Sequence, residues 1–177
     1  MKLIKILVVI SAAFLMSLSV MNAQTKAAGV SFAITGVGLS YEHYVETDSF
    51  LTFDLSVDTF DYFWMRASRM GVTADFIWNM IFAEKTTSLG NKISFFAGPG
   101  IMVGYVTDLK DMAGPAFGLK GKVGLECRFE RRITLSASLS PVIGSHITYP
   151  QGEVRMRLYR TGLVQSIIPE IGIKYAF

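Results

Sequence analysis

Cysteine is nearly absent from this sequence, in which Cys127 is the only one among 177 residues. An internal disulfide is therefore impossible, and no cysteine follows the N-terminal segment to carry a lipid anchor. Histidine, cysteine and acidic residues do not fall at the spacing of a metal site, so we expect neither a metal nor a cofactor. No basic tract points to nucleic acid as a partner.

Long apolar runs are missing as well, once the first 23 residues are set aside. Hydrophobic residues make up 51% of the chain, yet no later stretch reaches the roughly 18 apolar residues that a membrane-spanning helix requires. The apolar residues are therefore dispersed, and their spacing becomes the main indicator of the fold.

The N-terminal segment has the three parts of a secretory signal peptide. Two lysines precede an apolar run over 6–20, and small or polar residues follow. We predict a signal peptide over 1–23, although Met21 is large for its place before the cut; the alternative is an N-terminal membrane anchor. Its removal would take away two lysines and no acid, lowering the formal net charge from +3 to about +1. The remaining residues, 24–177, fit a single domain.

Apolar and polar residues alternate over most of the remaining chain. In the stretch "ITLSASLS", Ile133, Leu135, Ala137 and Leu139 share one parity, and the residues between them are Thr or Ser. Successive side chains of a strand point to opposite faces, so this pattern predicts strands with one apolar and one polar face. Several runs reach about ten residues, which is the length that crosses a bilayer when tilted. No helical stripe of comparable length competes.

The alternating runs predict eight strands, at 28–35, 37–46, 49–60, 70–84, 92–106, 115–130, 132–144 and 166–177. The connections after the second, fourth and sixth strands are short, and the longest connection, 145–165, joins the last two strands. Short periplasmic turns and long outer loops are typical of an outer-membrane barrel. We therefore predict an all-β fold, an eight-stranded antiparallel up-and-down transmembrane β-barrel.

The alternation leaves open which face points inward. A soluble lipocalin-type barrel would enclose a ligand with its apolar face, whereas a membrane barrel turns that face to lipid. The apolar face is bulky and rich in aromatic residues, and an eight-stranded barrel has little interior room, which favours the membrane arrangement. The polar face would then form an interior network of paired charges: Glu42, Asp54, Asp75, Lys120, Lys122, Glu126, Arg128, Glu170 and Lys174.

Three stretches carry a resemblance to a known class: "FFAGPGIMVGYV", "LECRFERRITLSASL" and the final "IGIKYAF". In these stretches the chain resembles small outer-membrane β-barrels of the OmpX and OmpA-transmembrane-domain type, in particular the PorT-like group. The resemblance implies export to the outer membrane of a Gram-negative-type bacterium. It also implies that Ile171, Ile173, Tyr175 and Phe177 form a signal read by the barrel-assembly machinery. Roles within this class vary widely, so the resemblance implies fold and location more than activity.

The interior and the histidines leave chemical alternatives open. A closed barrel of this size is packed, so we do not expect a solute channel. The charged interior is either a self-satisfied polar core or a path for protons or ions. Ser145 and His146 begin the longest outer loop, but adjacency in sequence does not bring a nucleophile and its base within reach, and we expect no catalytic residue. His43 lies near a turn at the opposite rim.

Two groups of loop residues are candidates for lipid contact. Because arginine pairs bidentately with phosphate, Arg155, Arg157 and Arg160 are candidates for contact with lipopolysaccharide; the alternative is a solvated loop. The stretch "DYFWMRAS" at 61–68 favours an aromatic belt at the membrane interface.

We therefore expect a non-enzymatic outer-membrane barrel with a structural or adhesive role, whose outer loops meet lipid, lipopolysaccharide or an unidentified extracellular protein. One alternative is an enzyme that modifies lipid A or phospholipid through a Ser and His site at the loop rim. The other is a secreted soluble barrel that binds an apolar ligand.

Overall fold

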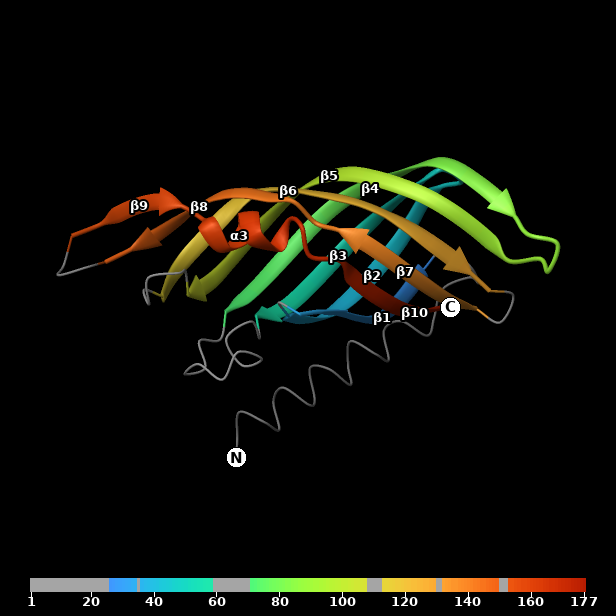
Figure 1. Cartoon of the computed structure of the whole chain (residues 1–177), viewed down its shortest axis with the longest axis horizontal. Coiled ribbons are helices and arrows are strands. Elements are labelled where there is room, and N and C mark those ends of the chain that lie inside the picture. Colours follow the sequence, from blue (N-terminus) through green and yellow to red (C-terminus); the bar gives the residue numbers. More distant parts are fainter. Residues whose placement is uncertain (1–25, 35, 59–70, 108–112, 130–131, 150–152) are drawn as a thin grey trace, which may run out of the picture.

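The computed structural model describes residues 26–34, 36–58, 71–107, 113–129, 132–149 and 153–177. The predicted signal peptide and the stretch 61–68 lie outside these ranges. The described residues form strands and one short helix (Figure 1), with these bounds: β1 (Lys26–Ala33), β2 (Gly36–Glu46), β3 (Ser49–Asp58), β4 (Val72–Thr86), β5 (Lys92–Thr107), β6 (Ala113–Arg128), β7 (Ile133–Leu139), β8 (Val142–Thr148), β9 (Arg155–Leu158), α3 (Arg160–Gln165) and β10 (Glu170–Ala176). No helix within the described ranges is long and apolar enough to cross a membrane.

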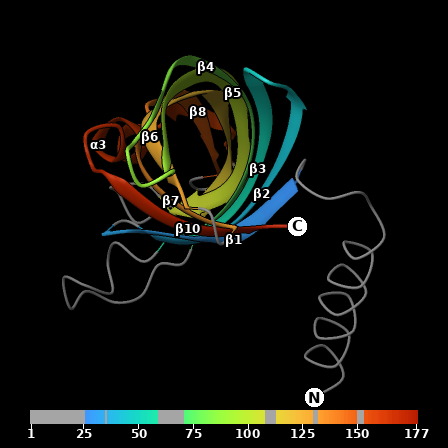
Figure 2. The ribbon, with the colours of Figure 1, turned by 90° about the vertical axis from the view of Figure 1, so that its right-hand side faces the viewer.

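The barrel wall has eight positions, each filled by a strand that is hydrogen-bonded to its neighbours on both sides. These wall positions close into a ring, which Figure 2 shows from one end. Going round, the hydrogen-bonded neighbours are β1, β2, β3, β4, β5, β6, β7 and β10, and β10 pairs back with β1. β8 continues the wall position of β7, since both pair with β6, and β9 adds to the other edge of β8. All these pairings are antiparallel. The predicted all-β, closed eight-stranded antiparallel barrel is confirmed.

The strands are strongly staggered around the ring. Following paired residues once around the barrel from Lys92 leads back to the same strand at Met102, ten residues further along. With about 3.3 Å per residue and about 4.8 Å between strands, this stagger corresponds to a tilt of about 40°. A strand of about ten residues at that tilt rises about 25 Å along the barrel axis.

The two ends of the barrel differ in their connections. The turn end, as we call it, holds the short connections after β2, β4 and β6 together with the start of β1 and the end of β10. The opposite end, which we call the loop end, holds the two-residue connection after β1, the longest connection, which follows β3, and the β8–β9 hairpin, which extends past the wall (Figure 1).

The first six strands lie within two residues of their predicted bounds. The prediction of one outer loop over 145–165 was wrong, because β8 runs to Thr148 and β9 and α3 occupy much of the remainder. The predicted seventh strand, 132–144, is also interrupted between β7 and β8, and the predicted last strand, 166–177, begins only at Glu170.

Two prolines account for the interruption. Pro141 separates β7 from β8, and Pro169 precedes β10, whose register with β7 ends where Glu170 faces Ser138. Proline has no N–H group to donate to a ladder. With one proline at the end of the ladder in each chain segment, the pairing cannot continue toward the loop end.

The backbone of β8 beyond this break is satisfied by residues around α3. The Tyr159 N–H donates to the Gly144 carbonyl over 2.9 Å, and the Val142 N–H donates to the Ser166 hydroxyl over 3.2 Å. The Ser166 hydroxyl in turn donates to the Gly162 carbonyl over 2.9 Å. The segment with α3 therefore takes the place of an eighth strand along this part of the wall.

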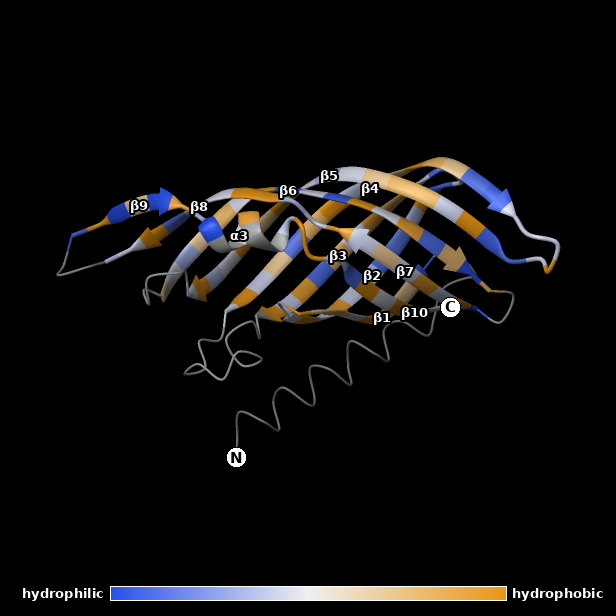
Figure 3. Cartoon of the chain, in the orientation of Figure 1, coloured by the Kyte–Doolittle hydropathy of each residue, from blue (hydrophilic) through white to orange (hydrophobic). Residues whose placement is uncertain are grey.

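Apolar side chains point outward and mostly polar side chains point inward, because the two kinds alternate along each strand. In Figure 3 this alternation appears as successive hydrophobic and hydrophilic colours along the strands. On β4, Phe76, Trp78 and Met80 are 37–56% exposed, whereas Asp75 and Asn79 are at most 4% exposed. Each wall position carries at least one exposed large apolar residue, for example Phe32, Leu39, Leu55, Trp78, Ile101, Leu119, Leu135 and Ile171. The barrel is thus encircled by an apolar belt.

Candidate functional site

The barrel interior is organised around β6, which brings four charged side chains into it. Lys120, Lys122, Glu126 and Arg128 share the inward parity of this strand. Gly124 lies between them on the same parity, where an added Cβ would crowd the neighbouring strand β7 and the ring of the inward Phe96. Because β6 pairs with β5 on one side and with β7 and β8 on the other, its charges are held at defined heights.

The two lysines of β6 reach across the interior to other walls. Lys120 Nζ donates to Asp75 Oδ2 over 2.6 Å. Lys122 Nζ donates to Asp54 Oδ2 over 2.8 Å and to Glu170 Oε1 over 3.4 Å. The acids belong to β4, β3 and β10, none of which pairs with β6. These ion pairs therefore tie walls that are not neighbours in the sheet.

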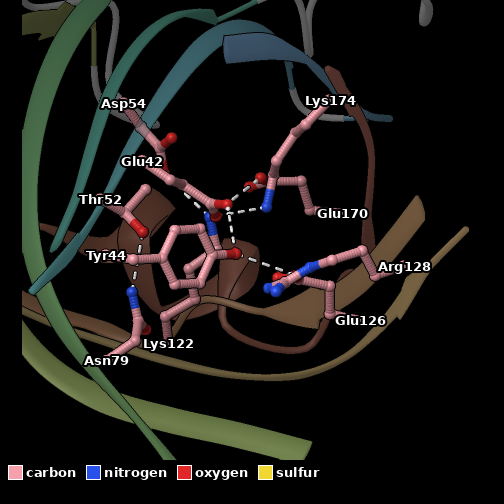
Figure 4. A network of polar contacts seen from close by, with 10 residues as sticks. All are labelled: Glu42, Tyr44, Thr52, Asp54, Asn79, Lys122, Glu126, Arg128, Glu170 and Lys174. Atoms are coloured by element: carbon pink, nitrogen blue, oxygen red, sulfur yellow. Dashed lines mark hydrogen bonds and ion pairs between the residues drawn. The ribbon is translucent and has the colours of Figure 1, made fainter. Parts of the chain in front are cut away.

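Further polar side chains, from the turn-end parts of β2, β6 and β10, join the same network, which Figure 4 shows from close by. Lys174 Nζ donates to Glu42 Oε1 over 2.5 Å, and both side chains are at most 2% exposed. The Tyr44 hydroxyl donates to Glu126 Oε1 over 3.0 Å, and Arg128 Nη2 donates to the same oxygen over 2.9 Å. The Arg128 guanidinium also stacks 4.7 Å from the centre of the Tyr44 ring. This group joins β2, β6 and β10.

All nine charged residues named from the sequence thus face inward, and each has at least one ion-pair partner among the others. Five are carboxylates and four are cations, so the set carries one more formal negative charge than positive. Three carboxylate oxygens, Asp54 Oδ1, Asp75 Oδ1 and Glu126 Oε2, are buried without a hydrogen-bond partner among the described groups. The network has many ion pairs, but some of its buried carboxylate oxygens accept no hydrogen bond from the described protein groups.

Part of the interior is apolar, which the sequence did not predict. Phe50 and Phe96 are each 1% exposed, with ring centres 5.3 Å apart, and Tyr44 lies 5.1 Å from Phe50. Ile77, which breaks the alternation of β4, is fully buried inside the barrel. Strand parity predicts that Phe96 faces inward, since it lies two residues from the inward Ser94. Its apolar side chain instead predicts an outward position, so the two indicators disagree at this residue.

Two cavities border the network. One of about 60 Å³ lies toward the loop end, and its lining includes Lys120, Ser140 and Glu170. The other, of about 320 Å³, lies at the turn end, and its lining includes Tyr44 and Arg128. The charged residues therefore meet a hollow at each end of the barrel interior.

Ser145 and His146 lie in β8, not in a loop as predicted. His146 is 1% exposed, and its Nε2 lies 3.2 Å from the carbonyl oxygen of Val106. Ser145 has the opposite parity, so its hydroxyl and the imidazole point to different faces of the strand. His146 adjoins an apolar cluster at the loop end, formed by Met102, Val106, Ala116, Val142 and Tyr159. His43 is half-buried on the outward parity of β2 near the turn end.

The three arginines of the predicted lipid contact lie at the loop end. Arg155 and Arg157 share one face of β9, Arg160 begins α3, and all three are exposed. Arg155 Nη2 donates to Glu153 Oε2 over 3.0 Å.

The residues of the predicted assembly signal lie on and after β10. Ile171, Ile173 and Tyr175 are 46–62% exposed on the outward face. The Phe177 N–H donates to the Lys26 carbonyl over 2.9 Å, which extends the pairing with β1 past the end of β10. β10 is the strand that closes the ring, between β7 and β1. The half-buried Cys127 has the outward parity of β6.

In comparisons with known proteins, no protein-family model, no curated protein and no solved structure matched this chain. Among the described residues, no group of three or more His, Cys, Asp or Glu side chains is placed to hold a metal ion.

Proposed function

We propose that this protein is an integral outer-membrane β-barrel without enzymatic activity, with a structural or adhesive role carried by its loop end. The supporting observation is the apolar belt, which runs around all wall positions. Soluble monomers rarely expose apolar patches larger than a few hundred Å². A bilayer would cover the belt, and a strand rise of about 25 Å equals the height of the lipid-facing band in such barrels.

The charged interior supports the same orientation. A lysine or arginine facing lipid at the midplane would cost about 2–4 kcal/mol, whereas Lys122 and Lys174 are at most 5% exposed and paired inside the barrel. A soluble barrel for an apolar ligand needs an apolar lining. Here, ion pairs bridge the space that such a ligand would occupy.

In this proposal the turn end faces the periplasm, and the barrel-assembly machinery reads the closing strand through Ile171, Ile173, Tyr175 and Phe177. The support is the exposed position of Ile171, Ile173 and Tyr175 where the ring closes, together with the hydrogen bond from the half-buried Phe177 to Lys26 of β1. Export through the predicted signal peptide is part of the same proposal.

The β8–β9 hairpin is proposed to contact lipopolysaccharide at the loop end. Met156 and Leu158 are 61% and 52% exposed, and they pair with Ile147 and Ser145 on the outward parity of β8, which continues the apolar belt. The exposed arginines Arg155, Arg157 and Arg160 would bind phosphate. Replacing all three with glutamine should weaken lipopolysaccharide binding, whereas Lys85→Gln at the turn end should not. Equal binding by the triple variant would remove this assignment.

Orientation is tested with spin labels at neighbouring positions of opposite parity in a Cys127→Ala background. Labels at Leu125 and Leu139 should be accessible to oxygen dissolved in the bilayer and shielded from a water-soluble nickel reagent. A label at Ser138 should be shielded from lipid. The reverse accessibility, or a folded protein that stays in aqueous solution without detergent, would overturn the proposed function.

A further inference from the structure

The cavity at the turn end is lined by three cationic side chains. They are Lys92 at the start of β5, Arg128 at the end of β6 and Arg132 directly before β7. Among the described residues that line this cavity of about 320 Å³, there is no acidic side chain. We propose that the cavity binds one anionic group, a carboxylate or a phosphate. This inference goes beyond the proposed function, since binding at this end does not depend on what the loop end contacts.

The strand register brings these cations together. Lys92 faces Arg128 across the β5–β6 pair, and Arg128 faces Thr134 across the β6–β7 pair. Arg132 lies two residues before Thr134, at the close of the short connection between β6 and β7. Lys92 and Arg128 are therefore spaced by the pairing of neighbouring strands, and the Arg132 carbonyl accepts a hydrogen bond from the Ala176 N–H over 2.8 Å.

The acids that pair with two of these cations lie outside the cavity lining. Lys92 Nζ donates to Glu84 Oε1 over 2.9 Å, and Arg128 Nη2 donates to Glu126 Oε1 over 2.9 Å. Arg132 has no ion-pair partner among the described carboxylates. Among the described residues, the three lining cations and their two paired acids together carry one positive charge in excess, which suits a single anion.

The shape of the mouth also favours an anion. Several cations that line a concave site with low-dielectric walls concentrate their electric field in the hollow. Guanidinium groups also bind carboxylate or phosphate through two parallel hydrogen bonds. Gly90, in the turn between β4 and β5, has a φ of 80°, which favours glycine, and it lines the cavity without a side chain to block it. The volume lies at the lower end of the range for small-molecule sites.

The test is a phosphate titration of the full chain in non-ionic detergent, with chloride adjusted to hold the ionic strength constant. Nuclear magnetic resonance would follow the Gly90 amide and the arginine side-chain signals. We expect saturable shifts at Gly90 and Arg132. The double variant Lys92→Gln/Arg132→Gln should bind phosphate at least about tenfold more weakly, because it loses two charge-assisted contacts.

The matched control removes two positive charges elsewhere, in the variant Lys85→Gln/Arg157→Gln. Lys85 is exposed in the same hairpin as Lys92, but it does not line the cavity. The control should bind phosphate like the unchanged chain. Absence of saturable shifts, or equal weakening in both double variants, would overturn the proposal. A dispersed spectrum establishes that each variant is folded.

Two further arms separate the sources of the anion. In nanodiscs of phosphatidylcholine alone, the shifts at Gly90 and Arg132 should require added phosphate if the ligand is a free anion. If a lipid headgroup fills the site, the same shifts should arise in nanodiscs containing phosphatidylglycerol, with no phosphate added. Either pattern supports an anion site, and shifts in neither arm would contradict it.

Discussion

Ion pairs deep inside the barrel and ion pairs at its rims join the same kinds of side chain, but the interior pairs are buried and the rim pairs are exposed to solvent. The Lys122 and Asp54 side chains are 4% and 2% exposed, whereas those of Arg155 and Glu153 are 50% and 71% exposed. An exposed pair contributes about 0–1 kcal/mol, but removing one partner of a buried pair costs about 3–5 kcal/mol. Loss of one partner of an interior pair should therefore strongly destabilise the folded barrel, whereas loss of a rim pair should change its stability little.

Most interior pairs also join distant parts of the chain, the exception being Arg128 and Glu126, which are two residues apart. Lys174 and Glu42 are 132 residues apart, whereas Arg155 and Glu153 are two residues apart. A local pair can form in an unfolded chain, but the interior pair requires the ring to be closed. The interior network therefore selects one stagger of the barrel, since a shift of register would separate several pairs at once.

The largest expected effect comes from Lys122→Met, which leaves Asp54 and Glu170 without their cation. The free energy of unfolding, measured by denaturant titration in lipid vesicles, should fall by about 3–5 kcal/mol. Lys85→Met, which removes an exposed lysine, should change it by no more than about 0.5 kcal/mol. Similar losses in the two variants would contradict the distinction between interior and rim.

A double-mutant cycle on Glu42 and Lys174 sharpens the comparison. Glu42→Leu and Lys174→Met should each cost about 3 kcal/mol, because each leaves a buried charge alone. The double variant should be more stable than either single variant, since it buries no unpaired charge. Additive losses, measured by the same titration, would mean that the two residues do not act as a pair.

Tyr44→Phe tests a neutral donor within the network. It removes the hydroxyl that donates to Glu126 and should cost about 1–3 kcal/mol of unfolding free energy. The control is Tyr41→Phe, because Tyr41 lies on the outward parity of the same strand. Equal stabilities of the two variants would show that the Tyr44 hydrogen bond contributes nothing.

The smallest effect is expected at the loop-end rim, where Glu153→Gln breaks the pair with Arg155. Unfolding free energy should change by no more than about 0.5 kcal/mol, and the change should disappear as salt is raised. A loss above about 1 kcal/mol that persists in high salt would put this rim pair in the same class as the interior pairs.

Local alternation made the regular part of the wall predictable. The strands up to β6 lie within two residues of the predicted ranges, because alternation within each segment marks its extent. The predicted bounds were wrong for the strands after β6, where Pro141 follows the end of β7 and Pro169 precedes β10, so that the ladder between them stops at Glu170 and Ser138. α3 was missed because Gly162 sits in its middle, where glycine is a poor helix former. The helix lies beside residues 142–144, the part of β8 that does not pair with β9.

The interior was open to prediction only in part. Parity identified nine charged residues, since each lies on the polar side of an alternating run. It could not pair Lys122 with Asp54, because that contact depends on a stagger of ten residues and on ring closure. It also left out Phe50 and Phe96, whose apolar side chains share the inward face with the charges.

The amino-acid sequence by itself determined that the chain is built from strands and which side chains share a face, because alternation is a property of each extended segment alone. Only the tertiary structure decided which walls meet across the interior, where the ladder breaks, and that three cations line one mouth. Those contacts join residues far apart in the chain, and their geometry depends on the stagger at which the ring closes.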